Sequence, residues 1–172
     1  MTDTIVRAAT VDDAHAIAVI HVRGWQTGYA GLMPQDFLDA LSIEQREEGW
    51  RSILSSGEGA SHQLVAERDG DVIGMASAGH ARDEDAEDRG ELWGIYVHPD
   101  VYSTGAGHAL ITAVEDALRA DGFTSASLWV LEGNHRATDF YERHGWLEDG
   151  ARKVDERPDL VLHERRRVKL LA

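Results

Sequence analysis

The stretch from Glu91 to Leu110 reads ELWGIYVHPDVYSTGAGHAL, and it decides the fold class. Its first seven residues predict a strand, and the period of two would place four side chains on one face: Glu91, Trp93, Ile95 and Val97. Pro99 ends this strand, because proline cannot donate to a strand ladder. A helix is then expected from Gly105 to Ala120, with an apolar stripe along one side. A strand that enters a helix through a glycine-containing loop is typical of a sheet with crossover helices.

The chain on either side of this stretch completes a mixed sheet. Upstream, the patterns predict a strand, two helices and a hairpin: Val6–Ala9, Val11–Tyr29, a helix capped by Ser42 that runs to Leu54, and His62–Arg68 paired with Val72–His80. Downstream they predict Ser125–Leu131 as a strand, Asn134–His144 as a helix and two further strands through Leu170. The order β-α-α-β-β-β-α-β-α-β-β indicates an α/β (α+β) domain over residues 1–172, with about seven strands and helices on both faces. The strands before Pro99 and after Gly122 should be parallel neighbours.

Composition narrows the classes of function. The 172 residues include 31 acidic and 17 basic side chains, for a net charge of −14, so the surface should repel nucleic acid. No apolar run is long enough for a membrane span, no secretory leader is recognisable, and cysteine is absent, which together favour a cytoplasmic protein. The nine histidines show no metal-ligand spacing, so no metal is expected. Arg165, Arg166 and Arg167 are expected on the surface or at a dimer edge of the last strand.

The loop from Tyr102 to Gly107 has the features of an anion site. It lies between the predicted strand and the predicted helix, where backbone N–H groups at a helix N-terminus are free to bind phosphate. The small residues Gly105, Ala106 and Gly107 would let an anion approach these amides closely. A tight strand-to-helix turn without a ligand explains the same pattern equally well. No Lys-Ser/Thr pair follows Gly107, which excludes a P-loop.

A second motif runs from Asn134 to Trp146 and reads NHRATDFYERHGW. The strand ending in Val97-His98-Pro99, the glycine loop, a helix, a strand and then this motif together resemble the GNAT N-acyltransferases. The resemblance covers nearly the whole chain and is strongest from Glu91 to Trp146. It implies a splayed central sheet in which two parallel strands diverge around the pantetheine arm of acetyl-CoA.

The resemblance also implies the residues that bind this acyl donor. Backbone groups of Ile95, Tyr96 and Val97 would hold pantetheine, and Asn134 would contact pantetheine or the phosphates. The pyrophosphate would rest on backbone amides of the loop: Ser103, Thr104, Gly105, Ala106, Gly107 and His108. The loop departs from the family pattern, because Tyr102 stands where Gln or Arg is usual and Ser103-Thr104 replaces the usual Gly-Arg. Cationic donors are thereby lost, whereas the backbone donors that should make most contacts remain.

Amine acylation requires a base and an acid. An ammonium with a pKa near roughly 10 must lose a proton before it can attack a thioester. By resemblance Glu91 is the candidate base and Tyr141 the candidate acid for the leaving thiolate. Glu91 as a bystander at the end of an acidic loop remains an equal alternative. Without a cysteine or a Gly-x-Ser-x-Gly elbow, direct transfer in a ternary complex is expected instead of an acyl-enzyme.

The acceptor is the least determined feature. The candidate walls for an amine are aromatic: Trp25, Tyr29, Trp50 and Trp93, of which the first two are four residues apart on one predicted helix. Core packing is an alternative for each. We expect a primary amine on a small molecule. The alternatives are a protein N-terminal or lysine acetyltransferase, and a non-catalytic acyl-CoA-binding sensor or regulatory module. A homodimer is expected only because members of the family often form one. The acidic run from Asp83 to Asp88 is expected to be a solvated loop.

Overall fold

The computed structural model describes residues 3–57 and 61–172. Its elements are β1 (Ile5–Ala8), η1 (Val11–Asp13), α1 (Ala14–Gly28), α2 (Gln35–Asp39), α3 (Ile43–Ser55), β2 (Ser61–Arg68), β3 (Asp71–His80), β4 (Gly90–Val97), η2 (Pro99–Val101), α4 (Ala106–Ala120), β5 (Ser125–Leu131), α5 (His135–Arg143), β6 (Leu147–Arg157) and β7 (Leu160–Leu170). The predicted order of strands and long helices is confirmed, and α2 was not predicted. In the described part of the chain, no helix is both long and apolar enough to cross a membrane.

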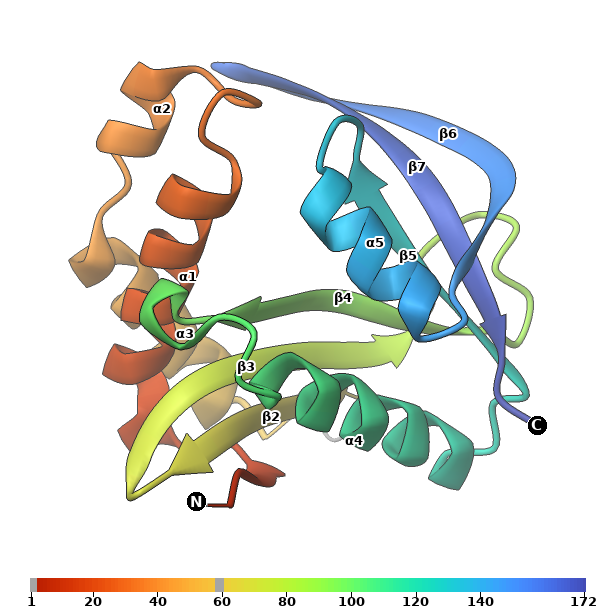
Figure 1. Ribbon diagram of the computed structural model, residues 1–172, viewed down its shortest axis with the longest axis horizontal. Coiled ribbons are helices and arrows are strands. Elements are labelled where there is room, and N and C mark those ends of the chain that lie inside the picture. The colour runs from red at the N-terminus through yellow and green to blue at the C-terminus, as the bar shows by residue number, and fades with distance from the viewer. Residues whose placement is uncertain (1–2, 58–60) are drawn as a thin grey trace.

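The seven strands form one sheet in the order β1-β2-β3-β4-β5-β7-β6 (Figure 1). All neighbours are antiparallel except β4 and β5, which are parallel and joined by the crossover helix α4. The predicted mixed sheet and its parallel pair are therefore confirmed. The hairpin between β2 and β3 turns through Asp69 and Gly70, which both have positive φ, as a two-residue primed turn requires.

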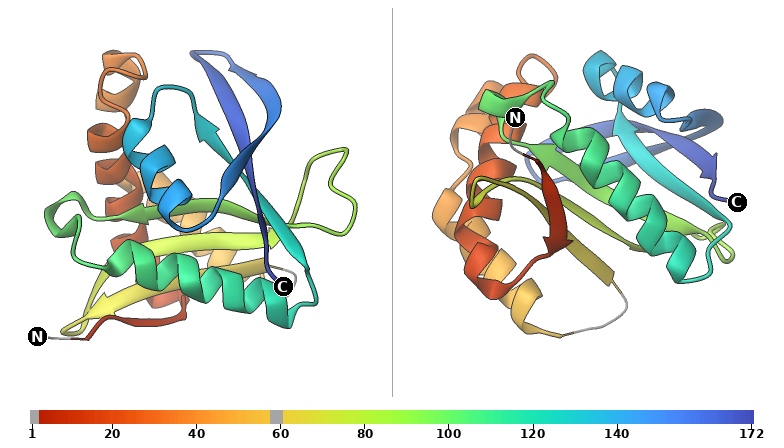
Figure 2. Two further views of the ribbon diagram at one scale, coloured as in Figure 1. Left: turned by 45° about the vertical axis from the view of Figure 1, so that its right-hand side comes forward. Right: turned by 60° about the horizontal axis from the view of Figure 1, so that its bottom comes forward.

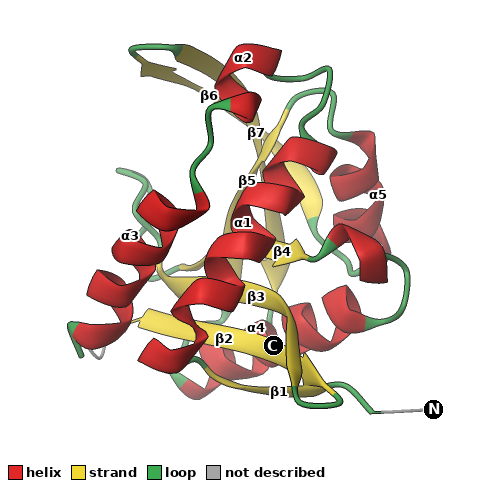
Figure 3. Cartoon of the chain, turned by 90° about the vertical axis from the view of Figure 1, so that its left-hand side faces the viewer, coloured by secondary structure: helices red, strands yellow, loops and turns green. Residues whose placement is uncertain are grey.

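Helices cover both faces of the sheet, as predicted. On one face α1 and α3 pack against β2 and β3 through a cluster that includes Ile17, Trp50 and Met75 (Figure 3). On the other face α4 and α5 pack against the centre of the sheet through a cluster that includes Leu110 and Trp146. Since alternate residues of β2 and β3 belong to different clusters, the sheet is a two-sided core.

The position of β7 corrects the expectation for the arginine run. Because the β6–β7 hairpin turns back, β7 lies between β5 and β6 and is not an edge strand. Arg166 and Arg167 are consequently buried. Arg166 binds Asp83 and Asp85 of the loop before β4, which projects beyond the sheet in Figure 2, and also Asp149 of β6. This loop is thus partly fixed by ion pairs and is not simply a solvated run of acidic residues.

Candidate active site

The site begins where β4 and β5 separate. These strands pair only at Gly90–Ala126 and Glu91–Ser127, and beyond these two pairs β5 rises away from β4 (Figure 1). A cavity of about 500 Å³ occupies the opening. Its walls come from β4, β5, the first turn of α4, one side of α5 and the end of α1. The splayed sheet expected from the family resemblance is therefore present.

A β-bulge in β4 changes which side chains face the cavity. Ser77 of β3 pairs with Gly94 and Ala78 pairs with Leu92, so Trp93 is an extra residue in β4. After the bulge, Ile95 and Val97 pack in the same cluster as Leu92, on the α4 face. The sequence-based assignment of Glu91, Trp93, Ile95 and Val97 to one face is wrong, because a bulge shifts the alternation by one residue.

The loop before α4 presents free amides to the cavity. Ser103 and Gly105 have positive φ, and Gly105 is the N-cap residue of α4. Among the described residues, no hydrogen-bond acceptor is paired with the backbone N–H groups of residues 103–108. Ser103, Gly105, Ala106, Gly107 and His108 line the cavity. The loop therefore has the geometry of an anion-binding helix N-terminus.

Thr104 has a different role from its neighbours. Its hydroxyl donates to the Val101 carbonyl at 2.7 Å, and its own carbonyl accepts from Arg68 Nη2 at 3.1 Å. Arg68 Nη1 also donates to the Thr104 hydroxyl at 3.1 Å. The Thr104 side chain does not line the cavity. It anchors the loop to the end of β2, so that only its backbone amide remains for a ligand.

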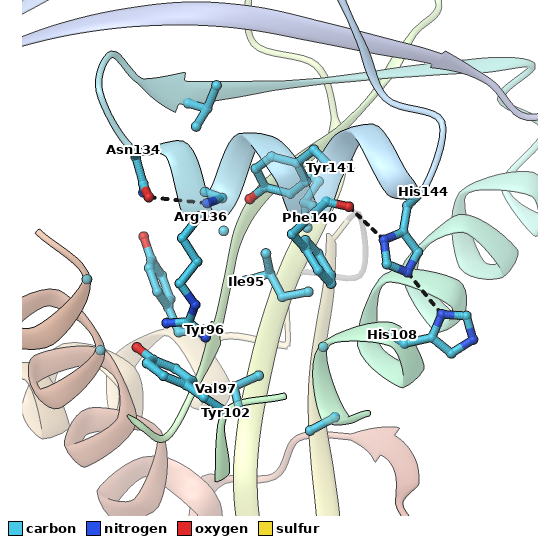
Figure 4. A pocket seen from close by; sticks show the side chains of 18 of the residues that line it. Ile95, Tyr96, Val97, Tyr102, His108, Asn134, Arg136, Phe140, Tyr141 and His144 are labelled. Atoms are coloured by element: carbon cyan, nitrogen blue, oxygen red, sulfur yellow. Dashed lines mark hydrogen bonds between the residues drawn. The ribbon is translucent and has the colours of Figure 1, made fainter. Parts of the chain in front are cut away.

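Arg136 of α5 and His144 at its C-terminal cap reach across the cavity to the loop and the first turn of α4 (Figure 4). The Arg136 guanidinium carbon lies 3.2 Å from the centroid of the Tyr102 ring. His144 Nδ1 contacts the Phe140 carbonyl at 2.8 Å, and its Nε2 lies 2.9 Å from His108 Nδ1. The sequence analysis did not single out Arg136 or His144. Their spacing from Phe140, at i−4 and i+4, would have placed all three on one helix face.

The remaining predicted residues of α5 lie at the cavity. Asn134 caps α5, because its side-chain oxygen accepts from the Ala137 amide at 3.2 Å. Tyr141 is 8% exposed and lines the cavity, and its hydroxyl makes no hydrogen bond with the described residues. Burial, with a further contribution from Tyr96, raises the pKa of Tyr141 above its ordinary value. Tyr141 is therefore a protonated phenol at neutral pH, able to donate.

Close packing of α4 against α5 depends on Gly107. A Cβ at this position would lie 3.2 Å from the Phe140 ring. Gly105 has open space around it but a φ of +94°, so glycine is favoured there for backbone conformation. Glycine is thus favoured at the two loop positions for different reasons, by backbone conformation at Gly105 and by close packing at Gly107.

Glu91 does not join the other predicted residues. Its carboxylate is buried and accepts from the Arg82 amide at 2.9 Å and from Arg82 Nη2 at 3.4 Å. Glu91 is absent from the cavity lining, whereas Tyr141 is part of it. Its role as a base stays a prediction, and the geometry places it in an ion pair beside the site.

The aromatic residues divide between core and cavity. Trp25 is 8% exposed and packs with Met33, Leu38 and Leu162, away from the cavity. Tyr29 lines the cavity together with Trp93 and Trp129. Of the four acceptor-wall candidates, Tyr29 and Trp93 are therefore in a position to contact a ligand, whereas Trp25 and Trp50 are core residues. In the described residues no cluster of three or more metal-ligating side chains occurs.

Comparison with known proteins identifies the family. The model of the acetyltransferase (GNAT) family matches residues 24–146. The chain is 35% identical over 129 residues to an uncharacterized N-acetyltransferase, YuaI, of Bacillus subtilis (strain 168), covering 75% of this chain and 72% of that one.

Two solved structures share the fold. One is a PaiA N-acetyltransferase from Thermoplasma acidophilum in complex with coenzyme A, with a TM-score of 0.73, 17% identity and coverage of 94% and 98% of the two chains. The other is yncA, a putative acetyltransferase from Salmonella typhimurium with acetyl-CoA, with a TM-score of 0.71, 20% identity and coverage of 99% and 95%. With a family match over most of its length and this fold, the chain belongs to the GNAT family of acetyltransferases.

Proposed function

We propose that this acetyltransferase transfers the acetyl group of acetyl-CoA to a primary amine of a small molecule, by direct transfer in a ternary complex. One observation carries the proposal: the unpaired amides of residues 103–108 and the Tyr141 phenol face the same cavity. A ligand with an anionic group at one end and a reacting group at the other could bind the amides with the first and contact the phenol with the second. Coenzyme A has this combination, and it is bound in the Thermoplasma acidophilum structure of the same fold.

The residues present fit acetyl-CoA. The free amides at the N-terminus of α4 would hold its diphosphate, and Arg136 would supply a cation that the loop itself lacks. Ile95, Tyr96 and Val97 pair with β3 on one side but not with β5 on the other, and the alternation of the ladder leaves the backbone groups of Ile95 and Val97 pointing outward for the amide-bearing arm. The Asn134 amide nitrogen makes no hydrogen bond with described residues and would add a donor.

Tyr141 is the proposed acid. When bound, acetyl-CoA supplies an activated acyl carbon with a thiolate leaving group. Because burial keeps the Tyr141 phenol protonated, it can donate a proton to the departing sulfur. The backbone N–H of Val97 would polarise the thioester oxygen, whereas that of Tyr96 points towards β3, because His98 N–H donates to Ile73 and the antiparallel ladder alternates. Since the sequence contains no cysteine, direct attack by the amine is the simplest scheme.

A small acceptor agrees with the dimensions of the site. The cavity of about 500 Å³ must contain the pantetheine arm and the acceptor together. Its lining includes three aromatic side chains that could contact an acceptor: Tyr29, Trp93 and Trp129. Such a pocket suits one amine group and a short body.

The decisive experiment measures release of CoA from acetyl-CoA with a panel of small amines, with amide products identified by mass spectrometry. Amine-dependent CoA release is expected, with acetyl-CoA consumed one for one with product. Binding of acetyl-CoA by calorimetry without turnover of any amine would instead identify a non-catalytic acyl-CoA-binding module. Turnover restricted to peptide N-termini or lysine peptides would contradict the small-molecule assignment.

A further inference from the structure

A second carboxylate lies next to a residue of the cavity wall, although, like Glu91, it is not itself part of the lining. Glu164 of β7 is directly opposite Leu131, the last residue of β5. Directly opposed residues of an antiparallel pair project from the same face, with Cβ atoms about 5 Å apart. Leu131 lines the cavity and packs against the cluster of Trp25 and Leu162. The Glu164 side chain therefore stands beside the cavity, on the face that α1 covers.

Glu164 has no partner within the described part of the chain. It is half-buried, yet its carboxylate makes no hydrogen bond and no ion pair with the described residues. Lys153 lies opposite it on β6, but the Lys153 ammonium is placed over the Trp129 ring, 4.5 Å from the centroid. Glu91, in contrast, is fully engaged by Arg82. Partial burial of a carboxylate without a cation costs free energy, and a cationic ligand bound beside it would offset that cost.

The surroundings of Glu164 are aromatic. Tyr29, Trp93 and Trp129 belong to the cavity lining, and Trp129 lies two residues before Leu131 on the same face of β5. Trp93 Nε1 is buried without a hydrogen-bond partner among the described residues, which gives this wall an unused donor. Glu164 is also near enough to raise the pKa of Tyr29, in addition to the larger effect of burial. One carboxylate and several π faces are the groups that recognise an ammonium on an apolar body.

We propose that Glu164 binds the ammonium of the acceptor and removes its proton, and that the acceptor is a primary amine with an aromatic or other apolar body. This inference rests on the proposed acetyl transfer. Glu164 takes one proton from the ammonium and releases it to water. The nitrogen lone pair then forms the C–N bond while the C–S bond breaks and sulfur keeps its electron pair. The second proton lost by nitrogen reaches sulfur by way of the Tyr141 hydroxyl, so the products are the amide and CoA thiol.

The electrostatic setting of Glu164 suits a base. Burial raises its pKa above the ordinary carboxyl value, Lys153 and Arg157 oppose this, and Asp155 and Glu91 add to it. The groups facing it from α1 and β4 are the Tyr29 and Tyr96 phenols. A carboxyl with a raised pKa is a better proton acceptor near neutral pH than an ordinary one. The rate should therefore rise with pH as Glu164 loses its proton.

The test compares three carboxamide variants of the intact protein: E164Q, E91Q and E156Q. Glu156 is an exposed carboxylate of β6 and serves as the matched control. The substrates are 2-phenylethylamine and ethylamine, which carry the same ammonium on different bodies. For E164Q we expect kcat/KM for 2-phenylethylamine to fall about 100-fold with loss of the acidic limb of the pH profile. Its affinity for acetyl-CoA should stay within about twofold, whereas E156Q should match the wild type.

Further arms separate the outcomes. In the wild type, 2-phenylethylamine should exceed ethylamine in kcat/KM by at least about tenfold. If E164Q also loses acetyl-CoA binding, E164D replaces it, and a fall of about tenfold with a displaced acidic limb is expected. If the folded E164Q or E164D variant kept the wild-type kcat/KM and pH profile, the proposed role of Glu164 would be overturned. A large fall in kcat/KM in E91Q but not in E164Q would overturn it as well. Preference for ethylamine would overturn the apolar acceptor. If the wild type turned over no amine at all, the proposed function itself would fail.

Discussion

The two ends of β4 differ in what they pair with. At its beginning, Gly90 and Glu91 are paired with β3 on one side and with β5 on the other. From Gly94 to Val97 only the β3 side is paired. The closed end is packed against α4, where a Cβ on Gly90 would lie 3.0 Å from Leu118. The open end borders the cavity. In this fold the binding site is therefore a stretch of sheet whose hydrogen bonds are left for a ligand.

The closed end must hold the two halves of the sheet together. Arg89, next to β4, donates from Nε to the Ser127 hydroxyl of β5 at 3.0 Å. On the α4–α5 face, Trp146 is fully buried and its Nε1 donates to Glu115 of α4 at 3.0 Å. These contacts lie outside the cavity lining. The comparison predicts that changes at the closed end lower stability, whereas changes at the open end lower binding or turnover.

The largest expected effect is at the closed end. W146A removes a fully buried indole and leaves the Glu115 carboxylate without that donor, so stability should fall by about 3 to 5 kcal/mol. Urea denaturation at neutral pH measures this change. Leu147, the next residue, is 59% exposed, and L147A is the matched control, with an expected change within about 0.5 kcal/mol. A loss below about 1 kcal/mol in W146A would mean that Trp146 does not hold the closed end.

At the open end, Y141F should reduce turnover without affecting the fold. Loss of one acid–base group lowers kcat by about 10- to 1000-fold, and the phenyl ring retains the packing. Acetyl-CoA affinity by calorimetry and the urea midpoint should be unchanged. Steady-state kinetics with a turned-over amine provides the measurement. An unchanged kcat would exclude Tyr141 as the proton donor.

Acid should lower the stability of the protein through His21 of α1, which packs against β4 and α3. This ring stacks on Tyr96 at 5.4 Å, and its Nδ1 accepts from Trp50 Nε1 at 3.3 Å. Burial, with a smaller contribution from Arg46, lowers the pKa of His21 to about 4. Because the unfolded chain binds this proton near pH 6.5, stability is complete above that pH and is lost as pH falls towards 4.

Urea denaturation at pH 7.5 and pH 5 tests the effect of His21. The loss from this residue should be about 2 kcal/mol, and H21Q should remove that part of the pH dependence while lowering stability at pH 7.5. The exposed His163 offers a control, since H163Q should keep the wild-type dependence. Equal pH dependence in H21Q and wild type would show that His21 is not the responsible group.

The smallest predicted effect concerns the loop. G105V places a β-branched residue at a φ of +94°, at a cost of roughly 1 to 2 kcal/mol if the binding conformation is kept. Acetyl-CoA affinity should therefore fall about tenfold. Gly70 has a φ of +86° and, like Gly105, no atom within 4 Å of an added Cβ, but it lies in the β2–β3 turn. G70V should lower stability similarly and leave affinity unchanged, and equal affinity in G105V would contradict the loop assignment.

Much of the open end could be predicted because local chemistry decides it. The helix start at Gly105, the cap at Asn134 and the parallel β4–β5 pair follow from turn residues and helical spacing, whereas the position of Tyr141 in the cavity was implied by the family resemblance. The bulge at Trp93 could not be predicted, because only pairing with β3 determines where an extra residue is accommodated. The anchoring of Thr104 by Arg68 could not be predicted for a similar reason, since Arg68 comes from a distant strand.

The sequence alone determined the order of elements, the mixed sheet and the loop of small residues before α4, because hydrophobic period, capping and backbone freedom are local properties. Only the tertiary structure decided that β7 lies inside the sheet, that Glu91 is engaged by Arg82 and that Glu164 is left free beside the cavity. The environment of a carboxylate depends on side chains brought from other strands. The spacing of residues along the chain does not show which side chains will be neighbours. Tertiary packing therefore determines which carboxylate is paired with a cation and which is free to accept a proton.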